Sequence, residues 1–305
     1  MHITLLDGGM GQELVRRSSH PAHPQWSAHV MIHEPEIVQA IHEDYLRAGA
    51  RVLTLNTYAS TPGRFERVGM PENFVPLQMK AVELVLAARD SVGVEATIAG
   101  CLPPLVGSYH PELLPDDATL LAEYRQIAET EAPHVDVFLC ETMSKASEAR
   151  MAATAAAETG KPVWLAWTLS EELGEDGQPR LRSGETVAEA MAALDGVAVE
   201  AIMFNCCPPE AMTAGMAQLA SDGRPFGGYA NGFTPIPPEF KLGTTVDLLD
   251  RRKDLGPEAY ADHAMQWVDA GASIVGGCCE VGPAHITELA TRMTGAGHRI
   301  TGRQG

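Results

Sequence analysis

The stretch Ala272-Ser273-Ile274-Val275-Gly276-Gly277-Cys278-Cys279 joins a short apolar run to two adjacent thiols, and Gly282-Pro283 follows closely. The apolar run predicts a buried strand, and the glycines predict a turn at its end. Two thiols on such a turn favour a metal-ligand pair, although free cysteines are also often buried as small hydrophobic residues. We therefore expect a sheet whose strand ends carry the functional side chains.

A second stretch of this kind lies upstream, where Ala201-Ile202-Met203-Phe204 runs into Asn205-Cys206-Cys207. Consecutive strand residues point to opposite sides, so only one of these two thiols can readily face a shared site. We predict that Cys206 is a ligand and that Cys207 packs beside it or in the core. Three thiolates, from Cys206, Cys278 and Cys279, would hold Zn²⁺ and leave one position open, as in catalytic zinc sites.

Short β-rich runs alternate with amphipathic or alanine-rich stretches, which is typical of repeated βα units around a parallel sheet. The predicted strands are 3–6, 51–55, 95–99, 135–140, 162–167, 201–204, 225–229 and 273–276. The predicted helices are 35–48, 71–92, 117–132, 145–158, 186–194, 210–220 and 257–269. Eight such strands predict an α/β fold, a (β/α)₈ TIM barrel, with residues 1–305 as a single domain. A doubly wound open sheet is the alternative, but no Gly-x-Gly-x-x-Gly follows the first strand.

Polar residues follow the predicted strands, where the active site of a barrel lies. They are Asp7, Asn56-Thr57, Glu141-Thr142, Asn205-Cys206, Asn231 and Cys278-Cys279. Cys101 and Cys140 also fall on or beside strand ends, and for these two we expect burial rather than metal binding.

The composition excludes several classes of partner. The 305 residues include 22 Lys and Arg against 40 Asp and Glu, a formal charge of −18, which repels nucleic acid and anionic lipid. The N-terminus has no signal-peptide pattern, and no run of about 18 apolar residues predicts a membrane span. Six sparse cysteines suit free thiols in a reducing compartment, so we expect a cytoplasmic protein. No sequence feature assigns an oligomeric state.

The sequence resembles the homocysteine S-methyltransferases, which share a zinc-binding (β/α)₈ domain with betaine-homocysteine methyltransferase and with part of methionine synthase. The resemblance rests on Leu6-Asp7-Gly8-Gly9-Met10-Gly11, Asn56-Thr57-Tyr58, Ala99-Gly100, Glu141-Thr142, Asn205-Cys206 and Gly276-Gly277-Cys278-Cys279. The sequence departs from the family pattern at Met203, where the family commonly has Gly, and at Glu280, where many members have Gly or Arg.

The resemblance implies that Cys206, Cys278 and Cys279 hold the zinc ion. It also implies that Asp7 and Glu141 bind the ammonium group of homocysteine. Asn56 and Thr57 are weaker candidates for positioning its carboxylate.

The expected reaction transfers a methyl group from a cationic donor to the homocysteine thiolate and gives methionine. A free thiol of pKa about 8.5 is only about 3% ionised at pH 7, and zinc coordination would deprotonate it. The resemblance favours S-methylmethionine or S-adenosylmethionine as donor, because a chain of this length lacks the C-terminal extension of the betaine enzymes. The alternatives are betaine as donor, another thiol or selenol acceptor, a non-catalytic zinc-bound barrel that binds an amino acid, and a redox barrel that uses Cys278-Cys279.

Two loops are expected near the pocket mouth: 171–182 as a lid or a solvated turn, and 231–238 as a proline-rich wall. His29 and His33 are expected on the surface of a short helix. Trp167 is expected either in the core or in an aromatic wall for the donor.

Overall fold

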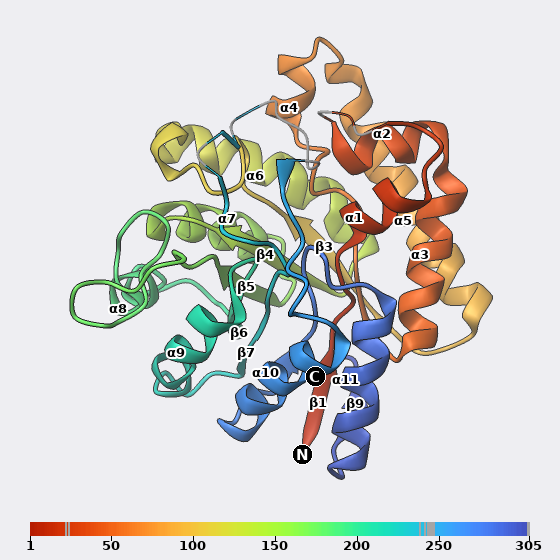
Figure 1. The fold of residues 1–305 in the computed structure, drawn as a ribbon. Coiled ribbons are helices and arrows are strands. Elements are labelled where there is room, and N and C mark those ends of the chain that lie inside the picture. The colour runs from red at the N-terminus through yellow and green to blue at the C-terminus, as the bar shows by residue number, and fades with distance from the viewer. Residues whose placement is uncertain (22, 24, 238, 241, 243–247, 304–305) are drawn as a thin grey trace.

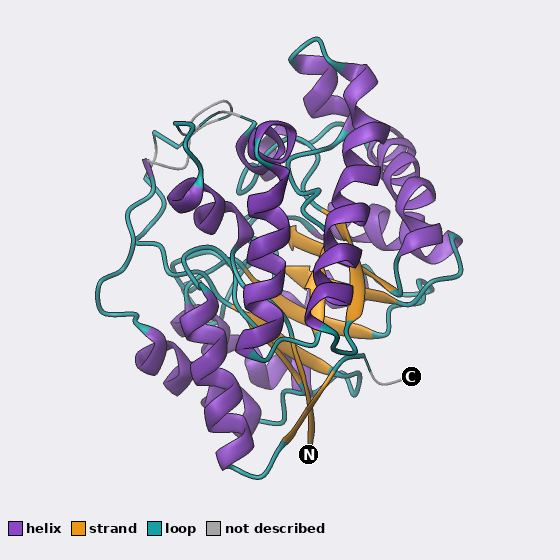
Figure 2. Ribbon diagram, turned by 90° about the vertical axis from the view of Figure 1, so that its right-hand side faces the viewer, coloured by secondary structure: helices purple, strands orange, loops and turns teal. Residues whose placement is uncertain are grey.

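The structure is a computed structural model, and it describes residues 1–21, 23, 25–237, 239–240, 242 and 248–303. A curled parallel sheet occupies the centre and helices surround it (Figures 1 and 2). The strands are β1 (His2–Leu5), β2 (Val52–Thr54), β3 (Thr97–Leu102), β4 (Val137–Met143), β5 (Val163–Trp167), β6 (Ala201–Asn205), β7 (Phe226–Tyr229), β8 (Ile274–Val275) and β9 (Arg299–Thr301). The α-helices are α1 (Met10–Arg17), α2 (Trp26–His33), α3 (Pro35–Ala48), α4 (Pro62–Arg67), α5 (Phe74–Val92), α6 (Asp117–Glu131), α7 (Ala146–Glu158), α8 (Val187–Ala192), α9 (Pro209–Ala220), α10 (Pro257–Asp269) and α11 (Pro283–Gly295). Single 3₁₀ turns cover Pro71–Asn73, Pro111–Leu113 and Ala132–His134.

The predicted barrel is confirmed. The first eight strands follow one another in the order β2-β3-β4-β5-β6-β7-β8-β1, and every pair is parallel. A parallel bridge between Leu6 and Val52 closes the ring, and Asp7 N donates to Val52 O at 3.1 Å beside it. All eight predicted strands are present, with ends shifted by at most a few residues.

The ninth strand was not predicted. β9 pairs in parallel with β1, with Ile3 opposite Ile300, so it extends the sheet at the N-terminal end of β1. Of its three residues only Ile300 is apolar, which leaves no periodic pattern to detect.

Two apolar layers hold the barrel together. Inside the ring lie Leu6, Val52, Ala99, Val137, Leu139, Trp164, Ala166, Ala201, Met203, Tyr229 and Ile274. The larger layer fills the space between the strands and the helices, and Trp167 is fully buried in it. Trp167 therefore belongs to the core, and the cavity described below has no Trp167 in its wall.

The helix starts follow local chemistry. Thr186 and Glu189 form a reciprocal capping box at α8, and Asp116 caps α6. α3 begins at Pro35 and ends before Gly49, whose φ of 114° suits glycine, so its bounds match the prediction. Helices α1 and α4 were not predicted, because each is short and contains a glycine.

Within the described residues, no helix has the length and apolar character needed to span a bilayer.

Candidate metal centre and substrate pocket

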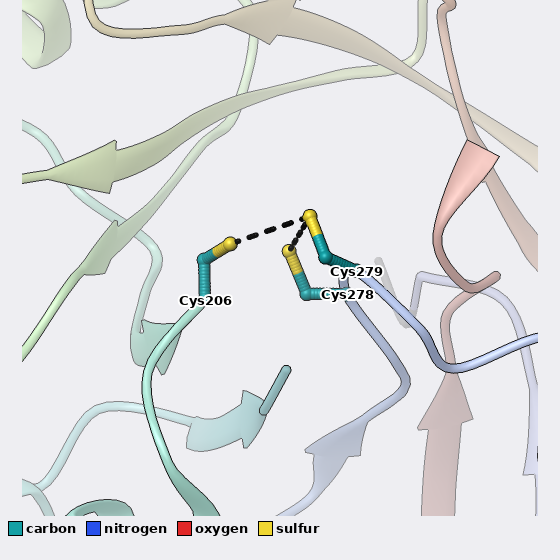
Figure 3. A group of neighbouring side chains, drawn as sticks. All are labelled: Cys206, Cys278 and Cys279. Carbon is teal, nitrogen blue, oxygen red and sulfur yellow. Dashed lines mark hydrogen bonds between the residues drawn. The ribbon is translucent and has the colours of Figure 1, made fainter. Parts of the chain in front are cut away.

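The structure brings together three cysteines that the sequence singled out. The sulfurs of Cys206, Cys278 and Cys279 all lie within 4.8 Å of one another (Figure 3). The Cys206 and Cys279 sulfurs are 3.7 Å apart, and those of Cys278 and Cys279 are 3.9 Å apart. Sulfurs bound to one tetrahedral zinc ion at about 2.3 Å would be about 3.8 Å apart, so two of the three separations match this metal and the third pair lies close to it.

Tight backbone turns present these thiols. Cys206 follows β6 directly and has a φ of 52°, which turns its side chain toward the end of β8. At Gly277 a Cβ atom would lie 2.1 Å from Val281 Cγ1, and at Gly9 it would lie 2.5 Å from Cys278 O. Glycine is therefore required at both positions for the chain to approach so closely.

Cys206 is the most acidic of the three thiols. Hydrogen bonds from Cys278 and Cys279 hold the pKa of Cys206 well below its usual range, against the opposing effect of burial. The hydrogen bonds that Cys278 and Cys279 make to Cys206, together with burial and the charge of Cys206, raise the pKa values of these two thiols. Three sulfurs that converge in one cavity form a donor set suited to a soft or borderline metal cation.

A tyrosine that the sequence did not reveal contacts the cluster. Tyr109 Oη lies 3.1 Å from Cys206 Sγ and donates to Cys206 O at 3.2 Å. The guanidinium of Arg182 lies over the Tyr109 ring, 4.4 Å from its centroid, and Arg182 pairs with Glu171 at 3.3 Å. Glu171 also accepts from Ile236 N at 2.9 Å, so the two predicted mouth loops are joined to each other and to the cluster.

Asp7 and Glu141 line the same cavity as the cysteines. Asp7 accepts from Thr54 N at 2.9 Å, and Glu141 accepts from Cys101 Sγ at 3.1 Å and from Tyr229 Oη at 3.3 Å. Burial raises the pKa of Asp7 to about 8, with Glu141 adding to the effect, and burial raises the pKa of Glu141 to about 7. None of these hydrogen bonds comes from a cationic group. The two buried carboxyl groups are therefore suited to bind a cation.

Of the remaining candidates, Asn56 lines the cavity and Thr57 does not. The Thr57 hydroxyl donates instead to the buried Glu131 at 2.8 Å. Gln12, which sequence reasoning missed, lines the cavity from α1, and both polar atoms of its buried amide lack a partner among the described residues. Gln12 is thus free to bind a polar group of a ligand.

The other cysteines lie outside the metal cluster of the described residues. Cys207 is fully buried in the layer between strands and helices, as the alternation of strand residues predicts. Cys140 is fully buried too, and Cys101 serves as a hydrogen-bond donor to Glu141.

Aromatic side chains complete the cavity wall around the metal cluster. They are Tyr58, Tyr109, Tyr229, Phe233 and Phe240. Phe233 comes from the loop after β7, as expected for that loop, although Pro238 at its end lies outside the described residues. Loop 171–182 contributes no residue to the wall in the described part of the chain and acts on it through Arg182.

Comparison with known proteins agrees with this geometry. The family model described as homocysteine S-methyltransferase matches residues 4–293. Homocysteine S-methyltransferase of Escherichia coli (strain K12) is 31% identical over 314 residues, which cover 95% of each protein. Selenocysteine Se-methyltransferase of Brassica oleracea var. italica is 26% identical over 95% of this chain and 88% of its own.

A solved structure supports the same relationship. The metallated form of the homocysteine methyltransferase MmuM from Escherichia coli superposes with a TM-score of 0.78 at 29% identity, over 95% of this chain and 96% of the other. The chain belongs to the homocysteine S-methyltransferase family.

Proposed function

We propose that this protein is a zinc-dependent homocysteine S-methyltransferase that takes a methyl group from S-methylmethionine or S-adenosylmethionine. The observation that carries the proposal is the spacing of three sulfurs, 3.7 and 3.9 Å, in the wall of a cavity that also contains two buried carboxylates. Residues 1–305 would work as one domain on small molecules, and the six free thiols suit a reducing compartment such as the cytoplasm.

The donor set decides which metal chemistry is available. Cys206, Cys278 and Cys279 would hold Zn²⁺, which supplies one further position where an entering thiol is kept deprotonated. Tyr109 would hold Cys206 in place through the contact between its hydroxyl and the sulfur.

Asp7 and Glu141 would bind the ammonium end of homocysteine. Each carboxyl has a raised pKa in the free protein because it is buried, and a bound ammonium would restore the ionised form through charge-assisted hydrogen bonds. Gln12 and Asn56, which line the same cavity, would bind the carboxylate that neighbours this ammonium group.

The aromatic wall suits a cationic methyl donor. Tyr58, Phe233 and Phe240 line the cavity, and ring faces attract sulfonium and quaternary ammonium groups. The donor loses its charge as the methyl leaves, so this chain's task is to align the donor with the thiolate and to exclude water.

A selenol acceptor is the second candidate. Two relatives, from Brassica oleracea and Astragalus bisulcatus, are selenocysteine methyltransferases at 26% identity. The same soft donor set would accept a selenolate as readily as a thiolate.

A panel assay tests these proposals. Zinc-loaded protein is incubated with homocysteine or selenocysteine and each of S-methylmethionine, S-adenosylmethionine and betaine, and the methylated product is quantified. We expect methionine from homocysteine with a sulfonium donor. Full zinc occupancy with no product from any pair would overturn the assignment, and faster turnover of selenocysteine would favour the second candidate.

A further inference from the structure

Four histidines gather where the segment after α1 meets α2. The ring centroids of His20 and His29 lie 5.5 Å apart, those of His20 and His33 lie 5.2 Å apart, and those of His29 and His33 lie 4.5 Å apart. His23 stacks on His29, with centroids 4.2 Å apart and an interplanar angle of 17°. None of these rings belongs to the cavity with the cysteines.

The spacing of three of these rings matches coordination of one ion. A ring nitrogen bound to zinc at about 2.0–2.1 Å places the ring centroid roughly 1.1 Å farther out, so tetrahedral neighbours have centroids about 5 Å apart. His20, His29 and His33 form a triangle of this size. His29 and His33 are also separated by one turn of α2, the spacing at which two histidines on one helix face bind zinc.

The segment that carries His20 is fastened to the end of α2. The carboxylate of Glu34, the residue after His33, accepts hydrogen bonds from Ser18 Oγ, from Ser19 N at 3.1 Å and from Ser19 Oγ at 2.7 Å. His20 N in turn donates to Ser18 Oγ at 3.0 Å. These bonds place His20 beside His33 before any ion arrives, which lowers the entropy cost of binding.

Two of the three rings are accessible to solvent. His20 and His33 are exposed and His29 is half-buried.

We propose that His20, His29 and His33 form a second metal site, which takes a divalent transition-metal ion such as Zn²⁺ through imidazole nitrogens alone. In the described structure their nitrogens do not converge as the cysteine sulfurs do. Binding would therefore require the three rings to turn toward the centre of the triangle. The ion would tie the segment after α1 to α2, whose Ser27 lines the cavity. The site does not depend on the proposed methyl transfer.

His23 provides a matched control within the same group of rings. It lies face to face with His29, and its Nδ1 already accepts a hydrogen bond from Gln25 N at 3.1 Å. We therefore exclude His23 from the ligand set.

Equilibrium dialysis with zinc buffered in the low micromolar range, followed by elemental analysis, tests the proposal on untagged protein. We expect two zinc ions per chain in the parent protein and in His23→Gln, and one in His33→Gln and in His20→Gln. A Cys206→Ser, Cys279→Ser double variant should retain one ion, and adding His33→Gln should remove it.

The double variant separates this site from the thiolate centre. If it binds no zinc, or if His33→Gln and His20→Gln both keep the parent's zinc content, the histidine site is refuted whatever the cysteines do. Loss of an ion in His23→Gln would refute the proposed ligand set.

Discussion

The side-chain amide of Asn205 pairs with Thr142 at two points. Asn205 Oδ1 accepts from Thr142 N at 2.7 Å, and Asn205 Nδ2 donates to Thr142 Oγ1 at 2.9 Å. Both partners are fully buried, and Thr142 has a φ of 62°. The pair joins the end of β4, which carries Glu141, to the end of β6, which Cys206 follows directly, so it fixes the position of Glu141 relative to Cys206.

Replacing Asn205 by Leu should therefore weaken both stability and metal binding. The change leaves the buried Thr142 N without an acceptor, at a cost of about 1–3 kcal/mol. Urea unfolding and zinc affinity measure the two effects. Thr142→Ser, which keeps the hydroxyl, is the control and should lose much less; equal zinc affinity in Asn205→Leu and the parent would contradict the positioning role.

Cys206 and Cys207 should respond differently to the same substitution. Cys206→Ser removes one of the three sulfurs, so it should abolish zinc binding at the three-cysteine centre, lowering the zinc content by one ion, and should abolish methyl transfer. Cys207→Ser places a hydroxyl in the apolar layer between strands and helices, so it should lower stability by about 1–3 kcal/mol while the zinc content stays unchanged. Zinc analysis of the two purified variants checks this, and the reverse pattern would show that the wrong thiol has been assigned.

Glu141→Gln should raise the KM for homocysteine. A charged hydrogen bond to the ammonium is worth about 1.5–3 kcal/mol, which corresponds to roughly 10–150-fold in KM if binding is the step affected. Zinc content should not change. Glu148, whose pKa burial also raises to about 7 but which does not line the cavity, provides the control in Glu148→Gln. An unchanged KM in Glu141→Gln would remove Glu141 from the substrate site.

Glu131→Gln should flatten the pH dependence of stability. Burial raises the pKa of Glu131 from 4.5 to about 8, so between these values the folded protein holds a proton that the unfolded chain has released. The free energy of unfolding therefore falls as pH rises through this window and levels off above it. The glutamine variant should lack this component, on the order of 2–4 kcal/mol.

Urea unfolding at pH 5.5 and pH 8.5 measures the difference, with the exposed Glu129→Gln on the same helix as control. Glu131→Gln should lose less stability than the parent between the two pH values, whereas Glu129→Gln should follow the parent. Parallel profiles for Glu131→Gln and the parent would contradict the assigned pKa.

The barrel and the cluster of three cysteines could be predicted from the sequence because both depend on local patterns. Apolar runs followed by polar residues mark strands and their C-terminal ends, and a barrel brings these ends to one rim. Strand alternation predicted that only one of Cys206 and Cys207 would face the site, and the Asn205-Cys206 motif of the resemblance selected Cys206; the fully buried Cys207 agrees with that choice.

What the sequence did not reveal depends on contacts between distant segments. Tyr109 lies in the loop after β3 and reaches Cys206 because of a φ of 69°, and no local motif marks this turn. In the sequence, nothing distinguishes Gln12 from other glutamines in helices. Only the position of α1 in the fold shows that Gln12 lines the cavity. Thr57, singled out beside Asn56, turns to Glu131, because the two neighbouring side chains leave the backbone in different directions.

The central claim is that the metal held by Cys206, Cys278 and Cys279 keeps a position open for the substrate thiol. X-ray absorption at the zinc edge tests this directly on protein whose histidine site has been removed by His33→Gln. The account predicts three sulfurs and one lighter atom in the free enzyme, and four sulfurs after homocysteine is added. A coordination shell that does not change on adding saturating homocysteine would contradict it.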